Sequence, residues 1–78
     1  MSEMARLRWY CRRGMKELDV LLENYLEQHY AAAAPEEQGA FRELLDRQDP
    51  EILDWIVGRA EPQGEALSRV VEILRTRR

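Results

Sequence analysis

The sequence has one cysteine, one histidine and no long apolar run. Because Cys11 is alone, an intramolecular disulfide cannot form, and nothing in the chain requires an oxidising compartment. One cysteine and one histidine also fall short of the ligand set of a structural zinc site. No segment approaches the roughly 20 apolar residues of a membrane-spanning helix, and the N-terminus lacks the apolar region of a signal peptide. We therefore expect a soluble, cytoplasmic protein that binds no metal and does not insert directly into a membrane.

Residues that could carry catalysis are also scarce. Nucleophilic catalysis needs a nucleophile, a base and an orienting group in one place, and nothing in the spacing of Cys11 and His29 indicates that they pair. We interpret Cys11 as a small buried hydrophobe and His29 as an aromatic-like residue near a helix end. Acidic pairs such as Glu36 with Glu37 are typical of solvated helix surfaces, and no glycine-rich phosphate loop is present. The sequence predicts no catalytic residue and no stably bound cofactor.

The charges are unevenly distributed, although the formal net charge is only −3. Residues 1–16 carry five cations against one acid, whereas residues 17–65 carry thirteen acids against three arginines. Residues 66–78 carry four arginines against one acid. Nucleic-acid binding needs a basic face of the domain as a whole, so an acidic middle argues against it. A protein partner fits this distribution better.

The hydrophobic spacing is helical nearly everywhere and nowhere alternates with the period of a strand. A chain of 78 residues, 45% hydrophobic and 35% charged, fits one ordered domain with a small core. We predict an all-α fold, a compact bundle of five short helices. The first helix spans about Glu3 to Arg12, the second follows Gly14, and the third starts at Pro35. The fourth has Asp49 as N-cap, Pro50 as first residue and Gly58 as stop. The fifth spans about Glu65 to Arg75.

The apolar stripes of these helices predict the core. Isolated helices of this length are marginal in water, so the stripes must be buried against one another. Trp55 lies within an apolar run, and we expect it to be buried as well. The predicted core comprises Leu18, Leu21, Leu22, Tyr25, Phe41, Leu44, Leu45, Ile52, Leu53, Ile56, Leu67, Val70, Val71 and Leu74.

The segment "CRRGMKELD" lies between the first two helices and admits two interpretations. As helix punctuation, its arginines complement the negative end of the first helix, Gly14 supplies a positive φ, and its acids complement the start of the second helix. As a docking site, the bend lets Arg13 and Glu17 project together beside an unshielded backbone. Trp9 shares a helix face with the arginines, and it either packs inside or lies on a contact surface. The residues alone leave these alternatives open.

Two motifs resemble a known family. "WYCRRGMKELD" contains R-G-x-x-E as Arg13, Gly14 and Glu17, and "RQDPEILDWI" at residues 47–56 has an acid-proline helix start followed by a tryptophan. Together, in a short helical chain, they resemble the SdhE-type succinate dehydrogenase assembly factors, small bacterial flavinylation proteins with mitochondrial counterparts. The similarity extends from about residue 8 to residue 75.

This resemblance implies a single helical flavinylation-factor domain over residues 1–78, a chaperone-like assembly factor and not an enzyme. It implies binding to the flavoprotein subunit of succinate dehydrogenase, and of the related fumarate reductase, with covalent attachment of FAD to a histidine of that partner. FAD would be bound by the partner and not stably by this chain. The implied partner-binding residues are Arg13, Gly14 and Glu17, with Met15 and Lys16 between them and Arg8, Trp9 and Asp49 at the rim.

A small helical regulatory protein is the alternative. Three short helices joined by tight turns can suggest a helix-turn-helix DNA-binding protein, but the acidic middle counts against nucleic acid. An antitoxin-like partner is a second form of this alternative, and the sequence contains nothing that decides against it.

Overall fold

A computed structural model describes residues 2–76, and within this range it contains five α-helices, one short 3-10 helix and no strand. The prediction of an all-α bundle of five short helices is therefore confirmed. Arg77 and Arg78, two of the four arginines of residues 66–78, lie outside the described residues. The elements are α1 (Glu3–Tyr10), α2 (Lys16–Gln28), η1 (Tyr30–Ala32), α3 (Pro35–Leu45), α4 (Asp49–Val57) and α5 (Glu65–Thr76).

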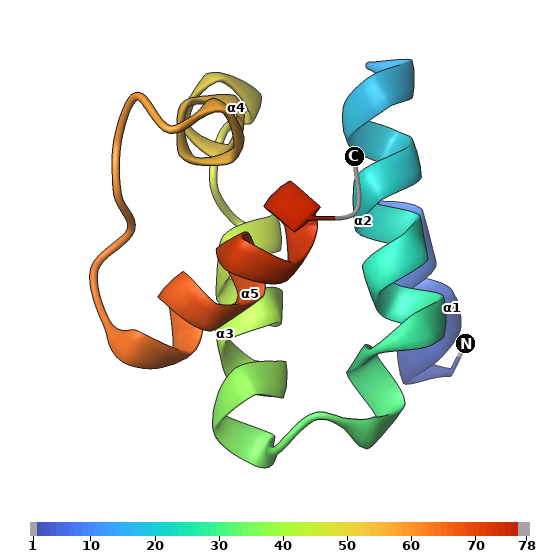
Figure 1. The fold of residues 1–78 in the computed structure, drawn as a ribbon. Coiled ribbons are helices and arrows are strands. Elements are labelled where there is room, and N and C mark those ends of the chain that lie inside the picture. The colour runs from blue at the N-terminus through green and yellow to red at the C-terminus, as the bar shows by residue number, and fades with distance from the viewer. Residues whose placement is uncertain (1, 77–78) are drawn as a thin grey trace.

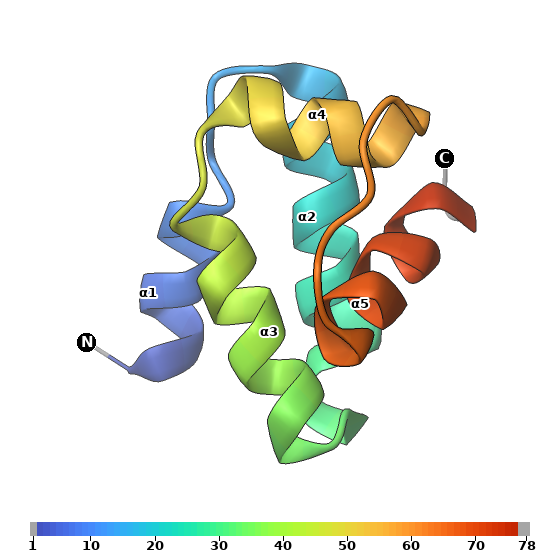
Figure 2. The ribbon, with the colours of Figure 1, turned by 90° about the vertical axis from the view of Figure 1, so that its left-hand side faces the viewer.

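The helices form a compact body of 35 × 27 × 20 Å (Figure 1). Helix α2 runs from one end of the molecule to the other, η1 reverses the chain, and α3 returns in the opposite direction. Helix α4 lies at the end where α2 begins, and α1 packs against α2 (Figure 2). Helix α5 packs mainly on α3 and also contacts α4 and α2. This arrangement places the α1–α2 and α3–α4 connections at the same end.

Local signals explain most helix boundaries. Pro35 occupies the first position of α3, and Gly58 ends α4 with a left-handed φ of 86°, both as predicted. Helix α1 ends at Tyr10, two residues before the predicted end. The reason is visible in the hydrogen bonds, because the N–H of Arg12 donates to the carbonyl of Trp9, only three residues back (3.1 Å). The last turn thus tightens and leaves the α-helical path.

Asp49 does not act as the predicted N-cap of α4. Gln48 occupies the N-cap position, Asp49 is already helical, and no side chain caps this helix start. The carboxylate of Asp49 instead accepts a hydrogen bond from Arg13, 36 residues away in sequence. The correction has a physical cause, since a nearby guanidinium offers this carboxylate a charge-assisted bond, stronger than a bond to a neutral backbone N–H.

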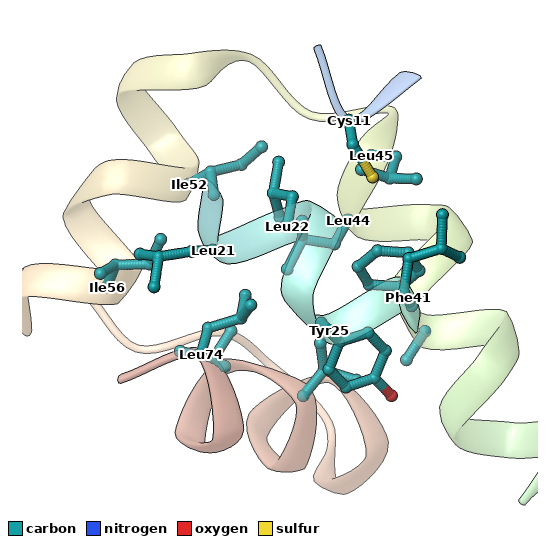
Figure 3. Close-up of a cluster of buried hydrophobic side chains, with 14 of the residues drawn as sticks. Cys11, Leu21, Leu22, Tyr25, Phe41, Leu44, Leu45, Ile52, Ile56 and Leu74 are labelled. Atoms are coloured by element: carbon teal, nitrogen blue, oxygen red, sulfur yellow. The ribbon is translucent and has the colours of Figure 1, made fainter. Parts of the chain in front are cut away.

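The core lies where α2, α3 and α5 meet, with side chains of α4 completing it at one end (Figure 3). The rings of Tyr25 and Phe41 stack at its centre with their centroids 4.5 Å apart. Every predicted core residue is buried except Leu53, which is half-buried beside the cluster. The core also contains Leu7, Cys11, Leu26, Tyr30, Ala40 and Trp55, of which Cys11 and Trp55 were expected to be buried.

Glu37 differs from the solvated acid that its neighbourhood suggested. It is buried, and its Oε2 accepts a hydrogen bond from the hydroxyl of Tyr25 at 2.6 Å. Burial and the bond to Glu37 raise the pKa of Tyr25 above its ordinary value. The hydroxyl of Tyr30 from η1 accepts a bond from Arg42 at 2.7 Å nearby. These polar groups close the core at the end of the molecule opposite to α4.

No helix between residues 2 and 76 combines the length and the apolar character needed to cross a membrane.

Candidate partner-binding site

The corner between α1 and α2 is built by Gly14 and Asp19. Gly14 has a φ of 86°, a value that residues with a Cβ rarely adopt, and Met15 continues in an extended conformation as the N-cap of α2. One turn into α2, Asp19 accepts hydrogen bonds from the N–H of Arg13 at 2.7 Å and of Gly14 at 3.3 Å. The predicted positive φ is confirmed, and a carboxylate of the following helix fixes the backbone of the corner.

The side chain of Arg13 turns inward at this corner. Its Nε donates to Asp49 Oδ1 at 2.7 Å, and its Nη1 donates to the carbonyls of Tyr10 at 3.0 Å and Leu45 at 2.8 Å. Its Nη2 donates to the carbonyl of Arg47 at 2.5 Å. Only 14% of the side chain is exposed. The picture of Arg13 projecting into solvent together with Glu17 is therefore wrong, because its donors are directed into the protein.

The acceptors of Arg13 explain why the sequence needs an arginine at this position. The carbonyls of Tyr10 and Leu45 belong to the last turns of α1 and α3, where no intrahelical N–H is available to them. A positive charge beside two helix C-termini is also electrostatically favourable. A planar guanidinium can reach several acceptors at once, which a lysine ammonium cannot do with the same geometry. Arg13 thus fastens the α1–α2 corner to the α3–α4 turn.

Arg47, which lies within the α3–α4 turn, makes contacts of its own that stabilise this turn. Its guanidinium carbon lies 5.8 Å from the centre of the Trp55 ring, and it forms ion pairs with Glu43 and Glu51 one turn away in each direction. The "RQDPEILDWI" segment is therefore held both by Arg47 and by the bond between Arg13 and Asp49. The two sequence motifs are distant along the chain and meet in the structure through Arg13 and Asp49, which are 36 positions apart.

The outer edge of the corner consists of Gly14, Met15, Lys16 and Glu17, all of which are exposed. A Cβ built on Gly14 would meet no atom within 4 Å, so the backbone there is open to an approaching molecule. Among the described residues, neither Lys16 nor Glu17 has an ion-pair or hydrogen-bond partner from a side chain. A flexible backbone would make this edge a poor recognition surface, but the Arg13 and Asp19 bonds fix it.

Arg8 and Trp9 lie on the exposed side of α1. The Trp9 side chain is 67% exposed, which answers the question that the sequence left open, since it does not pack inside. Tyr10 beside it is 49% exposed. Exposed aromatic and arginine side chains are enriched in protein–protein contacts. The structure leaves Arg8 and Trp9 accessible, as a role at the rim of a contact surface requires.

Cys11 and His29 lie at different ends of the core and do not form a catalytic pair. Cys11 is fully buried next to the α1–α2 corner, and desolvation raises the pKa of its thiol to about 12. His29 follows the last residue of α2 and stacks on Tyr25, with 5.6 Å between ring centres. Its Nε2 is buried without a hydrogen-bond partner in the described chain. Within residues 2–76, no cluster of His, Cys, Asp and Glu is arranged to hold a metal ion.

An apolar groove of about 430 Å³ adjoins the corner and was not foreseen from the sequence. It lies between α2 and α4, and its lining includes Val20, Leu53 and Val57 together with Lys16 and Glu17. A signal was present, because Val20 lies off the apolar stripe of its helix, among charged residues. Val20 is absent from the predicted core, and its apolar side chain was left without an explanation.

Comparison with known proteins agrees with the two motifs. Residues 5–78 match the family model described as "Flavinator of succinate dehydrogenase". The chain is 40% identical to the "FAD assembly factor SdhE" of Pseudomonas aeruginosa, over 94% of this chain and 87% of that protein. It is 37% identical to the protein of the same name from Yersinia pseudotuberculosis (99% and 88% covered), and 38% identical to that of Coxiella burnetii (85% and 80% covered). The chain therefore belongs to the family of flavinators of succinate dehydrogenase.

Proposed function

We propose that this protein binds the flavoprotein subunit of succinate dehydrogenase and promotes covalent attachment of FAD to a histidine of that subunit. The family match over residues 5–78 carries the proposal, and the relatives named as FAD assembly factors support it. The proposal extends to the flavoprotein subunit of fumarate reductase as a second client. The protein acts as an assembly factor, so FAD and the reacting histidine both belong to the partner.

The α1–α2 corner is the contact surface in this proposal. Gly14, Met15, Lys16 and Glu17 meet the partner directly, and Arg8 and Trp9 extend the contact along α1. Arg13 and Asp49 contribute in a different way, because the bonds of Arg13 hold the corner in shape while both side chains face the protein. A backbone fixed before binding loses less conformational entropy when the partner docks, which favours affinity.

The mechanism that follows is conformational. A binding protein changes an equilibrium only if it prefers one state of its partner, so the factor must bind best when the partner's histidine is aligned with bound FAD. Holding two reacting groups in the correct geometry can supply about 7 to 11 kcal/mol of a barrier in favourable cases. The flavoprotein then provides the chemical groups, and this chain provides the preference for the aligned state.

Coexpression tests the proposal directly. The flavoprotein subunit is produced alone, with the wild-type factor, or with Gly14→Arg or Glu17→Ala, and covalent flavin is read as fluorescence on the denatured subunit. We expect strong labelling with the wild type and weak labelling with both variants.

Gly64→Arg is the matched control for this experiment. Gly64 also has a positive φ, of 95°, and open space around its Cβ position, but it lies in the connection before α5. It should share the backbone strain of Gly14→Arg and retain flavinylation. Equal labelling of the subunit with and without the wild-type factor would overturn the proposal.

A further inference from the structure

The groove between α2 and α4 is an apolar feature of the described surface that the proposed contact does not yet use. The buried side chains of Leu18, Leu21 and Ile56 line the inner part of the groove. Figure 3 shows Leu21 of α2 directed toward Ile56 of α4. Val20 and Val57 stand at its sides and are 58% and 54% exposed. Burying the exposed part of these valines is favourable, so an occupant would gain affinity from this site.

The position of the groove connects it with the α1–α2 corner. Lys16 and Glu17 lie on the exposed edge of the corner and also line the groove. A partner that touches this edge therefore reaches the apolar lining within one turn of α2. Helix α4 forms the other wall, and its first residue is tied to the corner through Arg13 and Asp49. The two walls of the groove are thus held together by the same bonds that fix the corner.

The charges at the mouth indicate the chemistry of the occupant. Glu17 is exposed, and among the described residues no cation pairs with it. The other charged residue that lines the groove is Lys16, which also has no ion-pair partner among the described residues. Glu17 is therefore the acid at this mouth that is available to a partner, and it would select an arginine or lysine. The valines select an aliphatic or aromatic side chain beside it.

We propose that this groove receives an apolar side chain of the flavoprotein subunit, carried on a segment with an arginine or lysine about one helical turn away that pairs with Glu17. The inference rests on the proposed function and deepens it, because it names a second part of the contact. The edge of the corner orients the partner through charge and backbone, and the groove contributes apolar burial. Apolar anchors that fill a pocket commonly dominate the energetics of such contacts.

Binding measurements with charged variants test the groove. Val20→Asp and Val57→Asp change exposed positions, so both should remain folded by circular dichroism and thermal unfolding. With the purified, FAD-loaded flavoprotein subunit as probe, each variant should bind roughly tenfold more weakly or worse, as expected for the loss of an anchor contact. Ala31→Asp is the control, because Ala31 is equally exposed but lies in η1, at the other end of α2. It should bind like the wild type.

Photocrosslinking identifies the occupant. A photoreactive benzoylphenylalanine at Val57 should form a crosslink to a flavoprotein peptide that contains an apolar residue with a basic residue three or four positions away. The same probe at Met15 reports contact with the corner itself. A crosslink from Met15 together with none from Val57, or unchanged affinity of both valine variants, would overturn the groove proposal and leave the proposed function standing.

Two further outcomes separate the remaining possibilities. If the wild-type factor does not bind the flavoprotein subunit at all, the proposed function itself fails. If the isolated factor sediments as a dimer that Val20→Asp dissociates, the groove is occupied by a second copy of this chain, and the groove proposal is overturned.

Discussion

A charged side chain lies near each end of α2, Arg13 near its start and Glu37 near its other end, and the two are satisfied in different ways. At the start of α2, Arg13 donates to backbone carbonyls and to a carboxylate from three other parts of the chain. At the other end, Glu37 accepts one bond from the side chain of Tyr25. The first arrangement fixes the backbone beside an exposed edge, whereas the second closes the core. The first arrangement is the one that adjoins the proposed contact surface.

Arg13→Ala should have the largest effect. It leaves the carbonyls of Leu45 and Arg47 and the carboxylate of Asp49 without their donor, and we expect the free energy of unfolding to fall by about 3 kcal/mol. Urea denaturation measures this loss. Arg12→Ala is the control, because Arg12 is exposed and its truncation should change stability by less than about 0.5 kcal/mol. Equal stability of the two variants would show that the bonds of Arg13 do not hold the corner.

Tyr25→Phe should have the next largest effect and should act on stability alone. It removes the hydroxyl that donates to buried Glu37, and an unsatisfied buried acceptor costs about 1 to 3 kcal/mol. Thermal unfolding measures this change, and flavin labelling of the coexpressed subunit should be normal at temperatures where the variant is folded. Loss of labelling by a folded Tyr25→Phe protein would contradict the assignment of this end to stability.

Gly14→Ala and Gly64→Ala separate the effect of lost stability from the effect of a lost contact. Both residues have a positive φ and space for a Cβ, so each substitution should cost about 1 to 2 kcal/mol through backbone strain alone. Chemical denaturation should show similar losses for the two variants. Flavin labelling should fall only with Gly14→Ala, since only that methyl group lies on the proposed contact edge. Parallel losses of labelling would mean that stability, and not contact, limits flavinylation.

The last effect is negligible near neutral pH and appears only in the alkaline range. The thiol of Cys11 ionises near 9 in its ordinary state, whereas burial raises its pKa to about 12 in the folded protein. Between these values the unfolded chain loses a proton that the folded chain keeps, so the free energy of unfolding falls as pH rises. Burial also raises the pKa of Tyr25, which adds a decrease of the same sign.

Denaturation midpoints from pH 8 to pH 11 measure this decrease. Iodoacetamide should alkylate Cys11 only as fast as the protein opens. Rapid alkylation of the native protein at pH 8 would contradict the burial of this thiol.

Much of the fold could be predicted from the sequence because its signals are local. The positions of Pro35, Gly14 and Gly58 depend on the conformations that these residues allow, and these predictions are confirmed. The leucine stripe of α2 depends on helical periodicity and also predicted burial correctly. Tyr30 was missed because the chain reverses there through a 3-10 turn that has no periodic signal.

The site was less predictable because its contacts are distant in sequence. The R-G-x-x-E and acid-proline motifs were both recognised, but nothing in either motif shows that Arg13 bonds to Asp49 or to the carbonyl of Leu45. Aspartate is a residue type that favours the N-cap position, but the bond of Asp49 to Arg13 overrides this local preference. The groove likewise requires two helices that are not neighbours along the chain. The role of the corner in partner binding stays a prediction.

The contacts of Arg13 also bear on when, during folding of the chain, the corner acquires its fixed shape. The corner becomes rigid only when residues 45–49 have folded against it, so a chain that ends before that point has the motif but not its fixed shape. The contacts of Arg13 close a loop of more than 30 residues, and the entropy lost on closing it is part of the barrier to folding. An unfinished or partly unfolded copy therefore presents a loose edge. If the corner binds the flavoprotein subunit as proposed, that subunit would distinguish a complete factor from an incomplete one without any separate checkpoint.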